Sequence, residues 1–254
     1  MNINERIEYL RKKGLEKGTS YRWYKKWWAI SLFLIIGGFL VYVFAFLFLF
    51  FRFKANPSEA ELAKQLINTE NIINTTSSEN EAIKKIIENQ GNYYLGSDNS
   101  QYTLVVFSDF ACSYCKKTSE VIALLTVKYG DKIKIIVRDY PIISEDSTDL
   151  AMGAWCAGEQ GKYWPMYYKL FELQNTFSVD DLSLIAIEAG VTDISKFSDC
   201  LINEKYLNNI KKDFSDGQYL EIKGTPNWYI NGIKISSGYI SFDNWVTLLD
   251  KILK

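Results

Sequence analysis

An uncharged run of 25 residues from Trp27 to Phe51 restricts what the N-terminal part of this chain can form. The run is rich in Phe, Leu and Ile, and a helix of this length rises about 1.5 Å per residue, enough to cross a hydrocarbon layer roughly 30 Å thick. A buried core helix or a cleaved signal peptide would be shorter, and no persuasive small-residue cleavage site follows. We therefore predict a single transmembrane helix over residues 27–51 that is kept as an anchor in the lipid bilayer.

Positive charge is concentrated before this run. Eight basic residues precede it, namely Arg6, Arg11, Lys12, Lys13, Lys17, Arg22, Lys25 and Lys26, whereas the nearest ones after it are Arg52, Lys54 and Lys64. Because positively charged flanks stay inside, residues 1–26 are predicted to be cytoplasmic in a single-pass protein of the cell membrane. The large C-terminal part is then extracytoplasmic, where disulfides form and persist.

Composition excludes several classes of function. The chain has 29 basic and 30 acidic residues, so it lacks the basic excess that nucleic-acid binding usually requires. It contains no histidine, which excludes histidine metal sites, histidine general bases and Ser-His-Asp or Cys-His catalysis. Four cysteines must carry any sulfur chemistry.

Residues 52–90 are polar and rich in Asn, Glu and Lys, with two weak helical patterns. We interpret them as a partly helical tether that holds a domain away from the bilayer. The alternative is an edge segment that packs on that domain. Residues 91–254 are predicted to form the domain itself.

The domain opens with a pattern typical of a parallel β-α-β unit. Residues 102–107 are a continuous β-prone apolar run, as expected of a strand buried on both faces. Apolar residues at helical spacing follow over 112–129 and end before Gly130, and a second β-prone run covers 133–137. Such a unit implies two parallel strands joined by a right-handed helical crossover.

A helical insertion is predicted over about 145–222. Ser147 is a candidate cap for its first helix, Gly161 a candidate end, and Pro165 suits the first turn of the next helix. Ser178 can start a further helix, with Gly190 beyond its end.

A hairpin and a final helix complete the pattern. The dipeptide Asn231-Gly232 between two β-prone runs predicts a tight hairpin turn. Ser241 can cap a last helix that presents one apolar face. The residues of that face are Trp245, Leu248, Leu249 and Ile252.

Cys112 and Cys115 form a C-x-x-C pair where the first strand passes into the helix. Unpaired N–H groups and the helix dipole stabilise a thiolate at a helix N-terminus. Cys112 is therefore predicted to be an acidic, exposed nucleophile. Cys115, about one turn inside the helix, is predicted to resolve mixed disulfides.

Two other interpretations of this pair were weighed. Half of a zinc site would need Cys156 and Cys200 as further ligands, but they are 44 residues apart and lack the paired spacing of zinc knuckles. A purely structural disulfide is disfavoured by the position between strand and helix. We predict no metal and no cofactor.

Three ordered motifs resemble the DsbA-like thioredoxin-fold oxidoreductases. They are residues 107–116 (FSDFACSYCK), 154–164 (AWCAGEQGKYW) and 224–232 (GTPNWYING). The resemblance covers roughly residues 91–254 and is far more specific than C-x-x-C alone. It implies an α/β, thioredoxin-like fold with an inserted helical subdomain, here preceded by one N-terminal transmembrane helix.

The resemblance also implies roles for four residues. Pro226 would be a cis proline facing the cysteine pair, and Thr225 would offer backbone groups to an extended substrate peptide. Cys156 and Cys200 would match a structural disulfide that members often carry in the helical insertion. The alternative for these two is a pair of buried free thiols.

The sequence departs from the family pattern in two places. Ser113-Tyr114 replaces the Pro-His of strongly oxidising members, so a weaker oxidant is expected. Thioredoxins and several relatives carry a buried acid six residues before the nucleophile, where this chain has Val106. Proton transfer must then use another group or water, and the role of Asp109 stays open.

These observations predict an enzyme that exchanges disulfides with reduced or misoxidised secreted proteins and with a membrane or soluble redox partner. Donation of disulfides is the preferred direction. Alternatives are a reductase or isomerase, or a tethered peptide-binding or chaperone module whose thiols are dispensable.

Overall fold

The computed structural model describes residues 3–16, 35–44, 78–88 and 91–253. The chain divides into two units, Met1–Ser58 and Glu59–Lys254. In the first, helix α1 covers Ile3–Glu16, and residues 35–44 are also helical. Most of the predicted membrane segment 27–51 lies outside the described residues. Within the described ranges, no helix has the length and apolarity needed to span a bilayer, and the anchor stays a prediction.

The second unit is built on a mixed five-stranded sheet of order β1-β3-β2-β4-β5. Its strands are β1 (Tyr94–Gly96), β2 (Tyr102–Ser108), β3 (Ile133–Asp139), β4 (Asn227–Ile230) and β5 (Ile233–Ser237). Strands β2 and β3 are parallel and joined by helix α5 (Ser113–Tyr129), which confirms the predicted β-α-β unit. The short strand β1, antiparallel to β3, had not been predicted.

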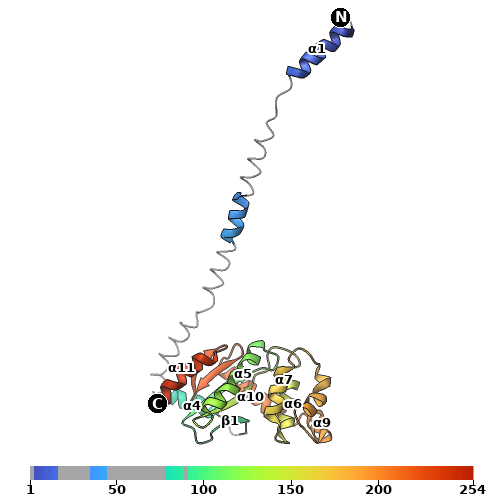
Figure 1. Cartoon of the computed structure of the whole chain (residues 1–254). Coiled ribbons are helices and arrows are strands. Elements are labelled where there is room, and N and C mark those ends of the chain that lie inside the picture. The colour runs from blue at the N-terminus through green and yellow to red at the C-terminus, as the bar shows by residue number, and fades with distance from the viewer. Residues whose placement is uncertain (1–2, 17–34, 45–77, 89–90, 254) are drawn as a thin grey trace. The chain divides into compact units, whose positions relative to one another are not determined.

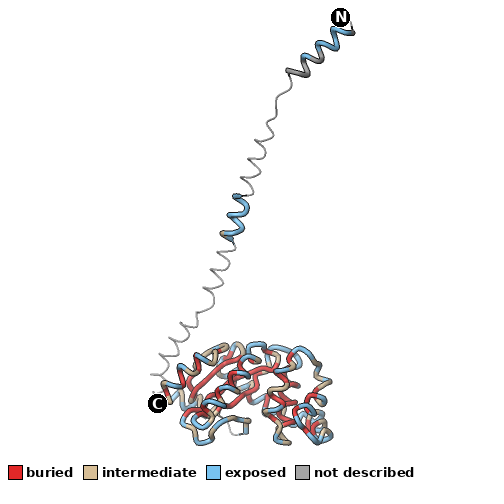
Figure 2. The backbone as a smooth tube through the Cα atoms, viewed as in Figure 1, coloured by how far each residue is buried: buried red, intermediate tan, exposed pale blue. Residues whose placement is uncertain are grey.

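Alternation along β2 explains why its sequence is apolar throughout. Leu104 and Val106 face the larger core, which includes α5 and the C-terminal helix α11 (Phe242–Ile252). Val105 and Phe107 face a smaller core on the opposite side of the sheet. Every residue of β2 is buried, and Figure 2 shows the buried backbone at the centre of the domain. The strand that leads to Cys112 is therefore held on both faces.

The helical insertion lies between β3 and β4. It comprises α6 (Ser147–Gly158), α7 (Tyr163–Glu172), η1 (Val179–Asp181), α8 (Leu182–Glu188), α9 (Ile194–Ile202) and α10 (Leu207–Tyr219). In Figure 1, α6, α7 and α9 group at one end of the domain, away from α11. The insertion thus extends the domain on the side of α7, which also packs on α5.

Most helix boundaries follow the predicted signals. Gly161 and Gly190 have φ values of 70° and 84° and stand just beyond α6 and α8. Ser178 and Asp181 form a capping box at η1. The prediction for Ser147 was wrong, because Asp146 occupies the cap position and the Ser147 hydroxyl donates instead to Asp109.

The hairpin and the last helix agree with prediction. Asn231 and Gly232 have φ values of 48° and 83°, the left-handed pair that a type I′ turn requires. The Ser241 hydroxyl accepts a hydrogen bond from the backbone N–H of Asn244 and caps α11. The four predicted apolar residues of that helix are buried.

Helix α4 (Ser78–Ile87) packs on the domain. The Ile87 side chain is fully buried in the smaller core, and the Arg138 guanidinium donates to the carbonyls of Ile86 and Ile87. For residues 78–87 the structure thus corresponds to the alternative of a packed edge segment, not to the preferred tether. Residues 52–77 lie outside the described part of the chain.

Candidate active site

Cys112 and Cys115 lie at the N-terminus of α5, where β2 delivers the chain into the helix. Cys112 is the cap residue, with φ −83° and ψ 121°, and its carbonyl accepts hydrogen bonds from the N–H groups of Cys115 and Lys116. Both cysteines are free thiols. The prediction of an exposed Cys112 was wrong, because its residue is only 7% exposed; Cys115 is 0% exposed.

The surroundings of Cys112 stabilise its thiolate and lower its pKa to about 5. The largest contribution is the Cys115 thiol, which donates a hydrogen bond to the ionised sulfur. Burial opposes this effect, but the Thr225 side chain and the backbone N–H groups of Cys115 and Tyr114 add further stabilisation. The thiolate is thus the main form of Cys112 at neutral pH.

Cys115 responds in the opposite direction. Burial raises its pKa far above the ordinary value, and donation of its proton to Cys112 raises the pKa further. Hydrogen bonding from the Ser108 side chain opposes the rise without reversing it. One sulfur is therefore ionised while its neighbour keeps its proton, an arrangement that distinguishes an attacking thiolate from a resolving thiol.

The loop before β4 covers the nucleophile. The Thr225–Pro226 peptide bond is cis, and the Thr225 carbonyl oxygen lies 3.3 Å from Cys112 Sγ and accepts its hydrogen bond in the thiol form. This loop accounts for the burial of Cys112, and it brings together the four residues that the sequence pattern placed at the site.

Asp109 clamps the loop that follows β3 onto the active-site loop. Its carboxylate accepts from the backbone N–H groups of Ala111, Ile142 and Ile143 at 2.8, 2.7 and 2.8 Å. It also accepts from the Ser147 hydroxyl at 2.7 Å. Asp109 is thus not the cap of α5, and its side chain holds two loops together beside Cys112.

Gln174 was missed by sequence reasoning. It follows α7, and its side-chain amide donates to the carbonyls of Phe110 and Cys112 at 2.7 and 3.1 Å. No motif signals this contact, because 62 residues separate Gln174 from Cys112. The amide joins the helical insertion to the backbone of the nucleophile.

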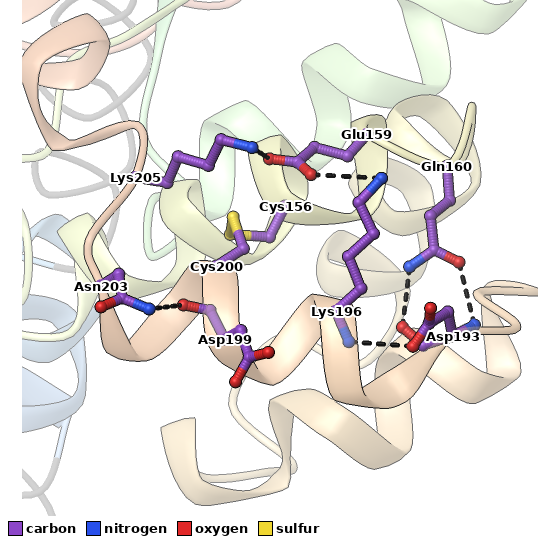
Figure 3. The surroundings of a disulfide bond; sticks show 9 residues. All are labelled: Cys156, Glu159, Gln160, Asp193, Lys196, Asp199, Cys200, Asn203 and Lys205. Carbon is purple, nitrogen blue, oxygen red and sulfur yellow. Dashed lines mark hydrogen bonds and ion pairs between the residues drawn. A yellow bond between two sulfur atoms is a disulfide. The ribbon is translucent and has the colours of Figure 1, made fainter.

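The second cysteine pair forms a disulfide. Cys156 of α6 and Cys200 of α9 are bonded, with their Cα atoms 5.7 Å apart. Figure 3 shows Glu159 beside the bond in ion pairs with Lys196 and Lys205. This bond removes both sulfurs as metal ligands, so the zinc interpretation loses the two residues on which it depended.

A thioredoxin family model (Thioredoxin_4) matches residues 88–251, which include the cysteine pair, the cis-proline loop and the insertion. The chain belongs to the thioredoxin family. Its match begins at the residue that follows α4 and ends inside α11.

Relatives of this thioredoxin-family chain differ in length. It is 27% identical over 172 residues to the probable disulfide bond formation protein D of Bacillus anthracis, covering 63% of this chain and 77% of that protein. It is also 27% identical over 152 residues to the Na(+)/H(+) antiporter NhaA 1 of Mycolicibacterium vanbaalenii, covering 58% of this chain. The chain spans about a quarter, 24%, of the length of that antiporter.

Solved structures of the thioredoxin family share the fold. The thiol-disulfide exchange protein α-DsbA2 of Wolbachia pipientis superimposes with a TM-score of 0.60 at 23% identity, covering 70% of this chain and all of that one. BdbD of Bacillus subtilis superimposes with a TM-score of 0.59 at 21% identity, covering 65% of this chain and 94% of that one. The resemblance to DsbA-like proteins and the thioredoxin-like α/β fold with its helices are thereby confirmed.

Apolar side chains remain exposed on the first turn of α5 and on the loop that follows β3. Tyr114, which lies between the two cysteines, is 56% exposed, and Ile142 and Ile143 of the clamped loop are 40% and 53% exposed. Lys116 does not point at the sulfurs as a free charge, because its ammonium donates to the Glu172 carbonyl at the end of α7. The surroundings of Cys112 are thus apolar at the surface and rich in hydrogen-bond donors beneath.

Proposed function

We propose that this chain is an extracytoplasmic thiol-disulfide oxidoreductase that donates the Cys112–Cys115 disulfide to secreted proteins. The observation that carries the proposal is the opposed ionisation of the two sulfurs, with the pKa of Cys112 lowered to about 5 and that of Cys115 raised. A buried pair with a structural role would gain nothing from such a difference.

The reaction proceeds by two exchanges. A substrate thiolate attacks Cys112 Sγ of the oxidised pair, the bond between the two sulfurs breaks, and Cys115 leaves. A second substrate thiolate then attacks the substrate sulfur of the mixed disulfide, and Cys112 leaves as a stable thiolate. Two electrons pass from the substrate dithiol to the pair, which a redox partner must reoxidise.

The low pKa of Cys112 supports disulfide donation. Stabilising the thiolate stabilises the reduced pair, and an easily reduced disulfide is an oxidant. A pKa of about 5 lies between about 7 for thioredoxin and about 3.5 for the strongly oxidising DsbA. This order agrees with the weaker oxidant expected from Ser113-Tyr114 in place of Pro-His.

Substrate is proposed to bind as an extended peptide along the cis-proline loop. Thr225 offers backbone groups beside Cys112, and pairing through the main chain accepts many sequences. The exposed Tyr114, Ile142 and Ile143 provide apolar contacts of the kind that unfolded, reduced polypeptides expose.

The location of the reaction is proposed from the sequence. The uncharged run 27–51 and the basic residues before it support a single-pass anchor with the domain outside the cytoplasm. The Cys156–Cys200 disulfide supports an oxidising compartment.

The test uses the full chain purified in detergent, with the pair oxidised, and a reduced model protein as substrate. We expect disulfides to appear in the substrate as they disappear from the Cys112–Cys115 pair, and Cys112→Ser to abolish the transfer. Ser119→Ala is the matched control, because it removes a hydroxyl from the same helix that bonds only the Lys116 carbonyl.

The direction of exchange is tested separately by trapping the thiol state of the pair in cells with an alkylating agent. A mainly oxidised pair agrees with disulfide donation. A pair held reduced at steady state would contradict it and favour a reductase or isomerase. An active chain that works unchanged without Cys112 and Cys115 would favour a peptide-binding module.

A further inference from the structure

Reduction of the pair requires a proton at a buried position. When a substrate thiolate attacks Cys112, the leaving sulfur is Cys115, which is 0% exposed and has a strongly raised pKa. A thiolate of high pKa is a poor leaving group unless it is protonated as the bond breaks. Position 106, where thioredoxins carry an acid, is Val106 here. Another group must supply the proton.

Asp139 faces the same side of the sheet as Cys115. Ser108 and Asp139 are register partners at the ends of the parallel strands β2 and β3. Side chains alternate along a strand, and the preceding pair on this face, Val106 and Val137, lies in the core that contains Cys115. The missing acid would be at position 106 on β2. Asp139 lies on the neighbouring strand β3, on the same face of the sheet, two residues beyond the partner of position 106.

Two buried hydroxyl groups lie near Cys115, and one of them, that of Tyr167, also responds to the charge of Asp139. The side chains of Ser108 and Tyr167 are buried, and neither hydroxyl makes a well-formed hydrogen bond to a described residue. The Ser108 hydroxyl lies near enough to Cys115 and to Tyr167 to lower the pKa of each. Burial raises the pKa of Tyr167, and the charges of Cys115 and Asp139 raise it further. Two unpartnered hydroxyls beside a buried thiol are costly to keep, which favours a functional reason for them.

The Asp139 carboxyl is held in place by Trp155, whose indole N–H donates to it at 2.7 Å. Burial, reinforced by the nearby charge of Asp213, raises the pKa of Asp139 to about 7. Near neutral pH this residue can therefore both give and take a proton.

We propose that Asp139 donates the proton that Cys115 takes up on leaving, relayed by the hydroxyls of Ser108 and Tyr167. This inference rests on the proposed function. Each hydroxyl passes one proton on and receives one, so it ends unchanged. When a partner reoxidises the pair, Cys115 attacks as a thiolate and its proton returns to Asp139. The acid is thus restored in each cycle.

Several other groups surround Asp139 and shape its titration. They are Asp109 on the loop after β2, Arg138 on β3, Tyr163 and Tyr167 on α7, and Asp213 on α10. Of these, Arg138 favours the charged form of Asp139, and the two aspartates disfavour it. The pH at which Asp139 is half protonated therefore depends on all of these groups together.

The test measures the rate at which dithiothreitol reduces the oxidised Cys112–Cys115 pair in the full chain, by quenching and alkylating thiols, over a pH range that spans the Asp139 pKa of about 7. Asp139→Asn keeps an acceptor for Trp155 but cannot donate a carboxyl proton. At pH values below the pKa of Asp139, we expect the wild-type pair to be reduced about tenfold to hundredfold faster than the pair in the variant. At pH values above that pKa, the ratio of the two rates should fall toward one.

Two further variants keep the test decisive if Asp139→Asn does not fold. Ser108→Ala and Tyr167→Phe each remove one hydroxyl, and combined they are expected to reproduce the pH-dependent ratio. Thr118→Val is the matched control, because it removes another buried, unpartnered hydroxyl from α5. Its ratio is expected to stay at one at every pH.

The outcomes separate the relay from the proposed function. If the wild-type pair exchanges with thiols but the ratio for Asp139→Asn stays near one throughout, the relay is overturned and the function stands. The relay would also be overturned if Thr118→Val lowered the rate of reduction as much as Asp139→Asn and neither effect depended on pH. Altered packing would then explain both losses of rate. If the wild-type pair does not exchange at all, the proposed function itself fails.

Discussion

The two cysteine pairs of this chain are built from the same atoms and kept in opposite states. Cys156 and Cys200 come from two helices, are bonded, and have charged side chains around them. Cys112 and Cys115 share one helical turn, are free, and have opposed pKa shifts. A helix N-terminus and hydrogen-bond donors around the sulfur lower the pKa of Cys112 and make it reactive, whereas Cys156 and Cys200, packed between two helices, form a crosslink.

The largest effects are expected when the sulfur atoms of Cys112 and Cys115 are removed one at a time. Cys112→Ser is expected to lower the rate of disulfide transfer by at least about a thousandfold, because the nucleophile is lost. Cys115→Ser should instead accumulate a mixed disulfide when it is offered a substrate that already carries a disulfide, because Cys112 attacks that bond, one substrate thiol leaves, and no resolving thiol remains. Gel shift under non-reducing conditions distinguishes the two. A mixed disulfide in Cys112→Ser, or none in Cys115→Ser, would contradict the assignment of roles.

The structural pair should behave in the opposite way. Replacing Cys156 and Cys200 together by alanine is expected to lower the free energy of unfolding by about 2–5 kcal/mol, because the unfolded chain regains the freedom of a loop of 44 residues. The rate of disulfide transfer at low temperature should stay within about twofold of the wild type, provided that the variant is folded. Denaturant unfolding and the transfer assay measure the two effects. A large loss of transfer in folded protein would assign this pair to the chemistry.

A smaller change at the reactive pair tests how its thiolate is stabilised. Thr225→Val keeps the shape of the side chain but removes the hydroxyl that helps to lower the pKa of Cys112. We expect the pKa to rise from about 5 by roughly half a unit to one unit, each unit being about 1.4 kcal/mol. Thiolate absorbance as a function of pH measures it. An unchanged midpoint would leave Cys115 and the helix as the sole stabilising groups.

Much of this arrangement could be predicted from local signals. The apolar run before Cys112, the glycines at 161 and 190 and the Asn231-Gly232 turn each act within a few residues, and the structure agrees with them. The cysteine spacing likewise placed the pair at the start of a helix.

Contacts between distant segments could not be predicted from local signals, and only the family resemblance indicated the cis-proline loop and the Cys156–Cys200 disulfide. Strand β1 has three residues, too few for a periodic pattern. Apart from Ala111, the partners of Asp109 lie 33 to 38 residues away. The burial of Cys112 was missed because the loop that covers it comes from position 225, whose approach depends on the whole insertion folding back to β4.

The smallest expected effect concerns charge beside the structural pair. Lys205 forms an ion pair with Glu159 and lowers the pKa of that carboxyl. Because Lys205 is 55% exposed, its ion pair is screened by solvent, and Lys205→Met should lower the free energy of unfolding by only about 0.5 kcal/mol. A carboxyl with a lowered folded pKa adds stability above its unfolded pKa and loses it as pH falls through the folded value.

The difference between Lys205→Met and the wild type should therefore be present at neutral pH and vanish in acid, as unfolding curves at several pH values would show. The rate of disulfide transfer and the pKa of Cys112 should not change, because the groups that contribute most to that pKa do not include Lys205. If this variant did shift that pKa, the two sulfur sites would be electrostatically linked across α6, and their contrast would not be one of local surroundings alone.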